Sequence, residues 1–395
     1  MDLRKLRAWW SQRQGLTSKP LTASASAVLA QSGWARSVGG CGPYLTLFSR
    51  AGISREAVDK AVANLEIHEL PSARACTYVL PAADYALALR LAQDFGAADV
   101  RTAEKLGVTA KEIDKAREAV LLALEKAPLE PDDIRQAVGK AVRSLGPEGQ
   151  KKGMSSTLPL ALAQLQKSGD IRRISTNGRL DQQRYRYALW RPNPLRGKTL
   201  DFEEACRQLA GRFFDWIAPA RVSDFQAFAG ISAKAAKAAV EPLKLESVLN
   251  TSDLLVLPSQ RSEFESFKAP NDPSYHLLIS IDSLLLLRHD LHILVDEKDL
   301  ASPLIVPKSG GTLMELPSPA IVDRGRVVGL WEYDPTSESI AYATLIKKGT
   351  LLKEAVAKTE EYVRTQLGDA RTFSLDSPKS RQPRIEALRI SARSK

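Results

Sequence analysis

The sequence has few of the residues on which several classes of protein and site depend. It contains only three cysteines in 395 residues, and Cys41, Cys76 and Cys206 lie far apart without CxxC spacing, so neither a disulfide framework nor a zinc finger is expected. Its four histidines lack metal-ligand spacing, no P-loop occurs, and the glycine-rich stretch Gly39–Tyr44 is unlike a dinucleotide fingerprint. The apolar run Ser283–Leu287 is too short to cross a bilayer, and the charged amphipathic start is unlike a secretory signal. We therefore expect no metal, no nucleotide cofactor, no membrane association and a reducing cytoplasmic setting.

Positive charge is present in excess and is unevenly distributed. The 56 lysines and arginines outnumber the 46 aspartates and glutamates by ten, which favours a polyanionic partner. Between Glu148 and Arg191 nine basic side chains accompany three acidic ones, and aromatic residues alternate with the arginines. We expect these arginines to contact DNA phosphates and the affinity to fall steeply with salt, while the aromatic residues could instead form the buried face of a strand. The candidate DNA-binding residues are Lys151, Lys152, Arg172, Arg173, Arg179, Arg184 and Arg186.

Three segments share the pattern of a helix-turn-helix. In each, an apolar helix ends at a glycine, a Ser or Thr cap follows, and a second helix has apolar residues three and four positions apart. Glycine allows the positive φ that ends the first helix, and the hydroxyl caps the amides of the second. The segments are Leu47–Val58, Ala103–Ile113 and Phe225–Ala236. Several copies in one basic chain favour a DNA-binding protein over an ordinary helical bundle.

Strand patterns after these helices predict winged helices. The clearest is Ile171–Ser175, which turns at Asn177–Gly178 into Arg184–Trp190, and Ala73–Leu80 is a shorter strand-like run. The predicted fold is mainly α with β: three tandem winged-helix domains, a small barrel-like C-terminal β-domain, a closing helix over 351–367 and a weakly ordered basic tail. The predicted boundaries are 1–97, 98–195, 196–262, 263–376 and 377–395.

Five stretches, taken in order, carry a resemblance to a known family. They are Pro43–Arg50, Arg74–Pro81, Tyr187–Trp190, Ile279–Leu286 and Val322–Trp331. In this order they resemble the winged-helix DNA glycosylases of the AlkZ and YcaQ type. The resemblance implies a C-shaped array of three winged helices with a β-domain, a channel for duplex DNA, and hydrolysis of the N-glycosidic bond of a damaged base without a metal.

The sequence departs from that family at the positions of its catalytic residues. Family members carry a Gln-x-Gln or Gln-x-Asp element where this chain has Gly39 and Cys41, and a histidine where it has Tyr78. If hydrolysis is retained, another polar group must orient water. The candidate catalytic residues are Glu69, His68, Tyr78 and Arg74, and the candidate base-pocket residues are Gly39, Cys41 and Tyr44. His68 and Glu69 could instead lie in a solvated loop.

Tyr44 could stack on an extruded base or fill the core. The small residues near Gly39 are expected to leave room beside the extruded nucleotide. Two classes of function follow: a cofactor-free DNA glycosylase acting on one modified base, or a duplex-binding regulatory or defence protein that has lost the active residues. In both cases we expect a monomer that binds double-stranded DNA near the nucleoid.

Overall fold

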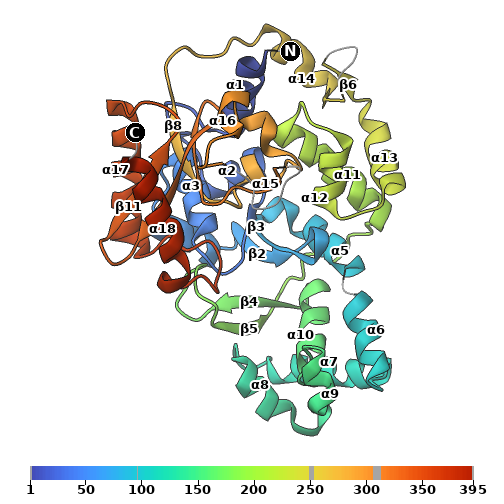
Figure 1. Cartoon of the computed structure of the whole chain (residues 1–395). Helices are drawn as coiled ribbons and strands as arrows, with labels where there is room; N and C mark the ends of the chain where they lie inside the picture. The colour runs from blue at the N-terminus through green and yellow to red at the C-terminus, as the bar shows by residue number, and fades with distance from the viewer. Residues whose placement is uncertain (1, 96, 249–252, 306–312, 394–395) are drawn as a thin grey trace. The chain divides into compact units, whose positions relative to one another are not determined.

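The computed structural model describes all residues except 1, 96, 249–252, 306–312 and 394–395 (Figure 1). Its contacts divide the chain into two compact units. Unit 1 comprises residues 1–68, 79–82 and 207–395, and unit 2 comprises residues 69–78 and 83–206. Among the described residues, no helix has the length and apolar composition needed to span a membrane.

The first helix-turn-helix lies in unit 1 and forms for the local reasons expected. Gly52 ends α3 in the left-handed region at φ 63°, and the Ser54 hydroxyl caps α4 by accepting from the Ala57 amide. The helices that begin this unit, with one short strand, are α1 (Leu3–Arg13), α2 (Ala25–Ser32), β1 (Ala35–Arg36), α3 (Gly42–Ala51) and α4 (Arg55–Ala63).

A hairpin follows, in which the chain passes from one unit to the other. Its strands are β2 (Ile67–Pro71) and β3 (Thr77–Pro81), and the sheet has the order β1-β3-β2. The expected strand over 73–80 is therefore wrong at its start, because Ala73–Ala75 forms the turn. The sequence pattern missed β2, the strand that carries His68 and Glu69.

Unit 2 contains the second helix-turn-helix and the clearest hairpin. Gly107 has φ 73°, and the Thr109 hydroxyl caps α7. The hairpin predicted around Asn177–Gly178 is present: β4 (Ile171–Ser175) pairs antiparallel with β5 (Tyr185–Leu189), and we call residues 171–189 the wing hairpin. The helices of this unit are α5 (Tyr85–Asp94), α6 (Ala97–Lys105), α7 (Ala110–Ala123), α8 (Pro131–Val138), α9 (Gly146–Lys151) and α10 (Leu158–Lys167).

The third helix-turn-helix lies in unit 1. Gly230 ends α12 at φ 70°, and the Ser232 hydroxyl caps α13. The sequence predicts strands over 245–249 and 253–257 after it; the structure has two short strands there, and Leu249 lies outside the described residues. The elements are α11 (Phe202–Ile217), α12 (Val222–Ala229), α13 (Ala233–Val240), β6 (Glu246–Ser247), β7 (Leu255–Val256) and α14 (Pro258–Ser266).

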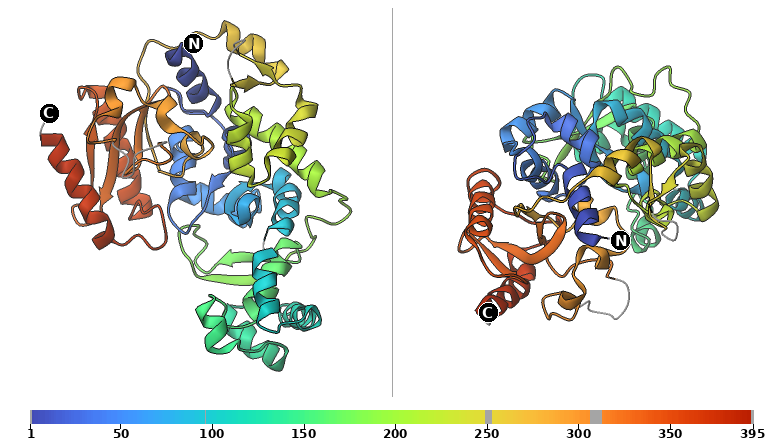
Figure 2. Two further views of the ribbon diagram at one scale, coloured as in Figure 1. Left: turned by 45° about the vertical axis from the view of Figure 1, so that its right-hand side comes forward. Right: turned by 90° about the horizontal axis from the view of Figure 1, so that it is seen from above.

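An antiparallel sheet forms the C-terminal part of unit 1, with strand order β11-β10-β9-β8. The sheet is open, so the barrel-like prediction is wrong for the described residues. The spacing of Gly and Pro indicates where strands turn, but it does not determine whether the sheet closes into a barrel. Figure 2 shows α17 and α18 on opposite sides of this sheet. Its elements are β8 (Tyr275–Leu278), α15 (Ser283–Leu286), α16 (Glu297–Leu300), β9 (Ala320–Asp323), β10 (Arg326–Asp334), β11 (Ser339–Thr344) and α17 (Thr350–Tyr362).

The basic C-terminal segment is an ordered helix, α18 (Pro378–Arg393), so the prediction of a weakly ordered tail is wrong. Ile385 and Leu388 are buried in the hydrophobic core beside the sheet and α1. Arg381 is almost fully buried and binds both carboxylate oxygens of Asp369 at 2.8 and 2.9 Å. Three of the basic side chains that suggested a solvated tail, Arg381, Arg384 and Arg389, form ion pairs with Asp369, Glu332 and Asp334. The chain is mainly helical with sheets, and the finer domain boundaries stay a prediction.

Candidate functional site

Glu69 lies in the middle of β2, and its side chain is only 7% exposed. The solvated-loop alternative is therefore wrong for Glu69 and for its neighbour His68, which is 3% exposed. Successive side chains of a strand point to opposite faces, so these two candidates do not act from the same side of β2. The structure assigns Glu69 to unit 2 and His68 to unit 1.

The Glu69 carboxylate is held by the wing hairpin. The Tyr185 hydroxyl donates a hydrogen bond to Glu69, and burial, together with this neighbouring carboxylate, raises the pKa of Tyr185. Tyr185 therefore stays protonated, and stays a donor, over the whole physiological range. A buried carboxylate needs such partners, because an unpaired buried charge is costly.

Arg173 completes the cluster with a positive charge. Burial alone would lower the pKa of Arg173, but Tyr187 and Glu69 outweigh it and raise this pKa. Its guanidinium lies 5.2 Å from the centre of the Tyr185 ring and 5.9 Å from that of Tyr187. A carboxylate, a phenol and a guanidinium thus meet in unit 2, an arrangement that can orient a water molecule and stabilise a developing cation.

Strand register explains why these side chains meet. Arg173 pairs with Tyr187 and Ser175 with Tyr185, so Arg173, Tyr185 and Tyr187 share one face of the wing hairpin. The aromatic residues therefore line a packed face of the hairpin. The alternation of Tyr and Arg in the sequence indicated this packed face. The spacing could not identify Glu69 on β2 as the residue that the face contacts.

The remaining candidate DNA-binding residues differ in their surroundings. On the other face of the wing hairpin, burial lowers the pKa of Arg172, with Tyr85 of α5 opposing this shift. Arg184 is exposed, and Arg186 is half-buried. The structure brings Arg172, Arg173 and Arg186 together on one hairpin, with Arg184 directly before β5.

The other basic candidates are either paired or distant in sequence from the hairpin strands. Arg179 donates from Nε to Asp181 Oδ1 at 2.8 Å within the hairpin loop. Lys151 pairs with Glu148 at 3.0 Å on α9, and Lys152 is exposed directly after that helix. The charge of Arg179 is therefore already balanced inside the protein.

Arg74 lies in the turn of the β2–β3 hairpin, and Tyr78 lies in strand β3. Arg74 is exposed in the turn with φ 58° and ψ 27°, and Ala75 beside it also has a positive φ of 55°. Two successive non-glycine residues in this region are strained, which is typical of a functional or tightly constrained turn. Tyr78 is buried in β3.

The loop that matches the family's glutamine element lies in unit 1 and is covered by another part of the chain. We call residues 371–376 the strap. The Cys41 amide donates to the Arg371 carbonyl oxygen at 3.0 Å, and the Cys41 thiol contacts the same oxygen at 3.2 Å. A Cβ at Gly40 would lie 2.2 Å from the Thr372 carbonyl oxygen, so only glycine fits there. The expectation that these small residues leave room for a nucleotide is therefore wrong at Gly40, where the strap occupies the space.

The other two candidate base-pocket residues are also constrained. Gly39 adopts a positive φ of 75° in the same loop. Tyr44 is fully buried in α3, and its hydroxyl donates to the Asp59 carboxylate of α4. This geometry gives Tyr44 a packing role inside the helix-turn-helix and leaves no face of its ring open to a base.

Metal chemistry has no visible basis in the part of the chain that the structure describes. No group of three or more His, Cys, Asp or Glu side chains there is arranged to hold a metal ion. Of the two histidines spaced three apart, His292 places its Nδ1 2.6 Å from Asp290 Oδ1.

Comparisons with known proteins agree with this fold. A family model described as DNA glycosylase AlkZ-like matches residues 23–373. The solved structure of the Streptomyces sahachiroi DNA glycosylase AlkZ is similar, with a TM-score of 0.68, 20% identity, and coverage of 94% of this chain and 98% of the other. A search of curated protein sequences found no significant match.

Proposed function

The chain belongs to the AlkZ-like family of DNA glycosylases, and from this premise we propose that it hydrolyses the N-glycosidic bond of a modified base in duplex DNA without a metal or nucleotide cofactor. The observation that carries the proposal is the buried Glu69 carboxylate, bonded by Tyr185 and accompanied by Arg173. We expect the enzyme to act as a monomer on cytoplasmic, nucleoid-associated DNA.

Glu69 would take the role that the family's glutamine element has elsewhere. As the N-glycosidic bond breaks, the sugar develops positive charge, which a nearby carboxylate stabilises. Glu69 would then accept a proton from the water that attacks the sugar carbon, while the base leaves with the bonding electron pair and takes up a proton from solvent. Glu69 would afterwards return its own proton to solvent. A carboxylate suits a more demanding leaving group than a cationic N7-alkylated purine, which leaves readily.

The duplex would be held through its phosphates. Arg172, Arg184 and Arg186 on the wing hairpin, with Lys151 and Lys152 at the end of α9 in the same unit, would supply the positive charge. Each phosphate contact releases counterions, so affinity is expected to fall steeply as salt is raised.

The Glu69→Gln variant tests this proposal. It keeps the shape of the side chain but cannot accept the proton, so base release should be abolished while duplex affinity is unchanged. Base release is measured as alkali-induced strand cleavage at abasic sites, on duplexes carrying N7-methylguanine, a bulky alkyl-purine or glucosylated hydroxymethylcytosine. Undiminished release in the variant would remove Glu69 from the site.

A second function has its own supporting observation. In the loop of Gly39 and Cys41 the strap covers the backbone, and neither position carries a group that can orient water. A protein that binds duplex DNA as a regulatory or defence factor without cleaving any base fits this loop. Tight, salt-sensitive binding without strand cleavage on every modified duplex would favour it over the enzyme.

A further inference from the structure

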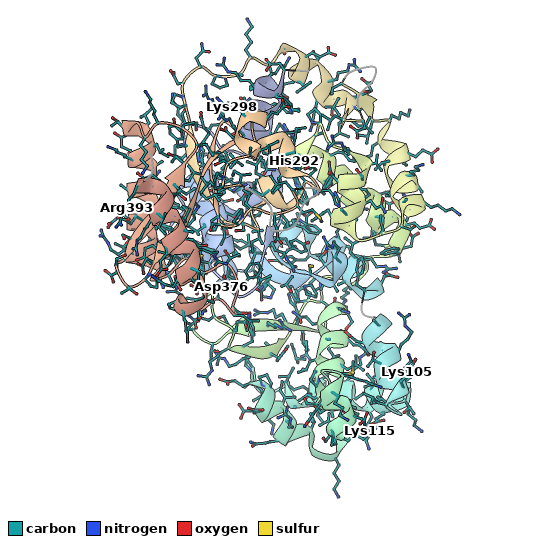
Figure 3. All side chains as sticks on the ribbon, viewed as in Figure 1. Lys105, Lys115, His292, Lys298, Asp376 and Arg393 are labelled. Carbon is teal, nitrogen blue, oxygen red and sulfur yellow. The ribbon has the colours of Figure 1, made fainter. Side chains whose placement is uncertain are left out.

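Arg173 holds a positive charge beneath the surface of unit 2, beside Glu69. Lys105 and Lys115 of the same unit, labelled in Figure 3, are exposed, whereas Arg173 is half-buried. The Nε atom of Arg173 is buried and has no hydrogen-bond partner among the described residues. An arginine stays protonated in proteins, so this charge is permanent. Buried polar atoms without a partner are few in native proteins, and groups with a catalytic role are among them.

The strand register determines which face of the wing hairpin carries this charge. Arg173 lies on the same face as the two tyrosines of β5, whereas Arg172 and Arg186 lie on the opposite face. Strands β4 and β5 contribute no acidic side chain to either face. The carboxylate that acts on Arg173 comes instead from β2, where Glu69 lies. The two faces of the hairpin therefore offer their arginines to different partners.

The guanidinium of Arg173 lies against the two tyrosine rings. It is 5.2 Å from the centre of the Tyr185 ring and 5.9 Å from that of Tyr187. Aromatic rings attract cations, and at these rings Arg173 already takes that place. A base that arrives with a positive charge would lie close to the guanidinium, and like charges repel more strongly where water is excluded. The cluster is therefore unfavourable for a cationic base.

Modified bases differ in the charge that they develop on leaving. A neutral base takes the bonding electron pair and becomes negative while the sugar becomes positive, and a proton from solvent then neutralises the base. An N7-alkylated purine is cationic before the bond breaks and becomes neutral, so it develops no negative charge. The negative Glu69 and the positive Arg173 match the separation of charge that only a neutral base produces in the transition state.

We propose that Arg173 makes the site selective for modified bases that are neutral before they leave, because its guanidinium stabilises the negative charge on the leaving base and repels bases that are already cationic. This inference rests on the proposed function, since it names the class of base that is released at Glu69. Arg173 then acts on the base, and the phosphates are left to Arg172 and Arg186 on the opposite face of the hairpin.

The Arg173→Met variant tests the selectivity, because it removes the charge and nearly keeps the length of the side chain. Single-turnover release is measured on one duplex with glucosylated hydroxymethylcytosine, which is neutral, and on one with N7-methylguanine, which is cationic. We expect release of the neutral base to fall at least tenfold, and release of the cationic base to stay within twofold of the wild type or to rise. The ratio of the two effects does not depend on the folded fraction of the variant, because both rates come from one preparation. Arg173→Lys keeps the charge and should lose less on the neutral base than Arg173→Met.

The matched control is Arg135→Met, which removes an exposed arginine from α8 of the same unit and changes the net charge by the same amount. It should change neither rate by more than twofold. Equal losses on both duplexes in Arg173→Met would indicate a structural or phosphate-binding role and would refute the selectivity, as would unchanged release from both. Release of N7-methylguanine and not of the neutral base by the wild type would refute it as well. Absence of release from both duplexes by the wild type would contradict the proposed function together with this inference, whereas release with an unchanged ratio in the variant contradicts the selectivity alone.

Discussion

The hydrogen bond from Tyr185 to Glu69 allows a sharp prediction for the Tyr185→Phe variant. The substitution removes one oxygen atom and keeps the ring over which Arg173 lies at 5.2 Å. A hydrogen bond to a charged group contributes about 1.5–3 kcal/mol. If the bond orients the carboxylate during bond cleavage, its full loss from the transition state corresponds to a rate reduction of about 10- to 150-fold.

Single-turnover base release from a modified duplex measures this loss, and fluorescence anisotropy measures duplex affinity in parallel. The matched control is Tyr187→Phe, which removes a hydroxyl bonded to Arg173 from the next residue on the same face of the wing hairpin. We expect a large loss of rate for Tyr185→Phe, a smaller loss for Tyr187→Phe, and unchanged affinity for both. Release within twofold of the wild type would refute the reasoning.

Two further predictions concern the stability of unit 1. Arg50 binds both oxygens of Asp282 at 2.8 Å in a fully buried pair, so Arg50→Ala should lower the free energy of unfolding by about 3–5 kcal/mol in urea titrations, and a loss below about 1 kcal/mol would contradict it. Burial lowers the pKa of His276 to about 4, with the Ser49 carbonyl partly opposing the shift, so the neutral imidazole stabilises the fold fully above about pH 6.5. This contribution, at most about 3 kcal/mol, should be lost as the pH falls from 6.5 to 4 in the wild type and not in His276→Gln; parallel pH curves for the two proteins would exclude it.

The helix-turn-helix units could be predicted because their causes are local. Gly52, Gly107 and Gly230 all end a turn at positive φ, and Ser54 and Ser232 cap the next helix, as the sequence pattern indicated. Only the residues at the turn decide this geometry. The wing hairpin was predictable for the same reason, from alternating residues on either side of Asn177–Gly178.

The predictions from the sequence were wrong where contacts between distant segments determine the structure. The C-terminal strands form an open sheet because α17 and α18 cover its two faces. The helix α18 is ordered because Arg381 pairs with Asp369 and Arg389 pairs with Asp334. Composition alone had indicated a solvated basic tail. Ion pairs between residues far apart in sequence leave no periodic signal along the chain.

The candidate site, too, could be predicted only in part from the sequence. The sequence alone indicated the family resemblance and the basic character of the 148–191 region. It also indicated Glu69 as a carboxylate that could replace the missing glutamines. Only the tertiary structure decided that Glu69 is buried in a strand and bonded by Tyr185, and that Gly40 is small because the strap passes against it. Neighbouring residues determine the local backbone preferences and the local charge. The partner of a buried side chain depends instead on packing between segments that come together only on folding.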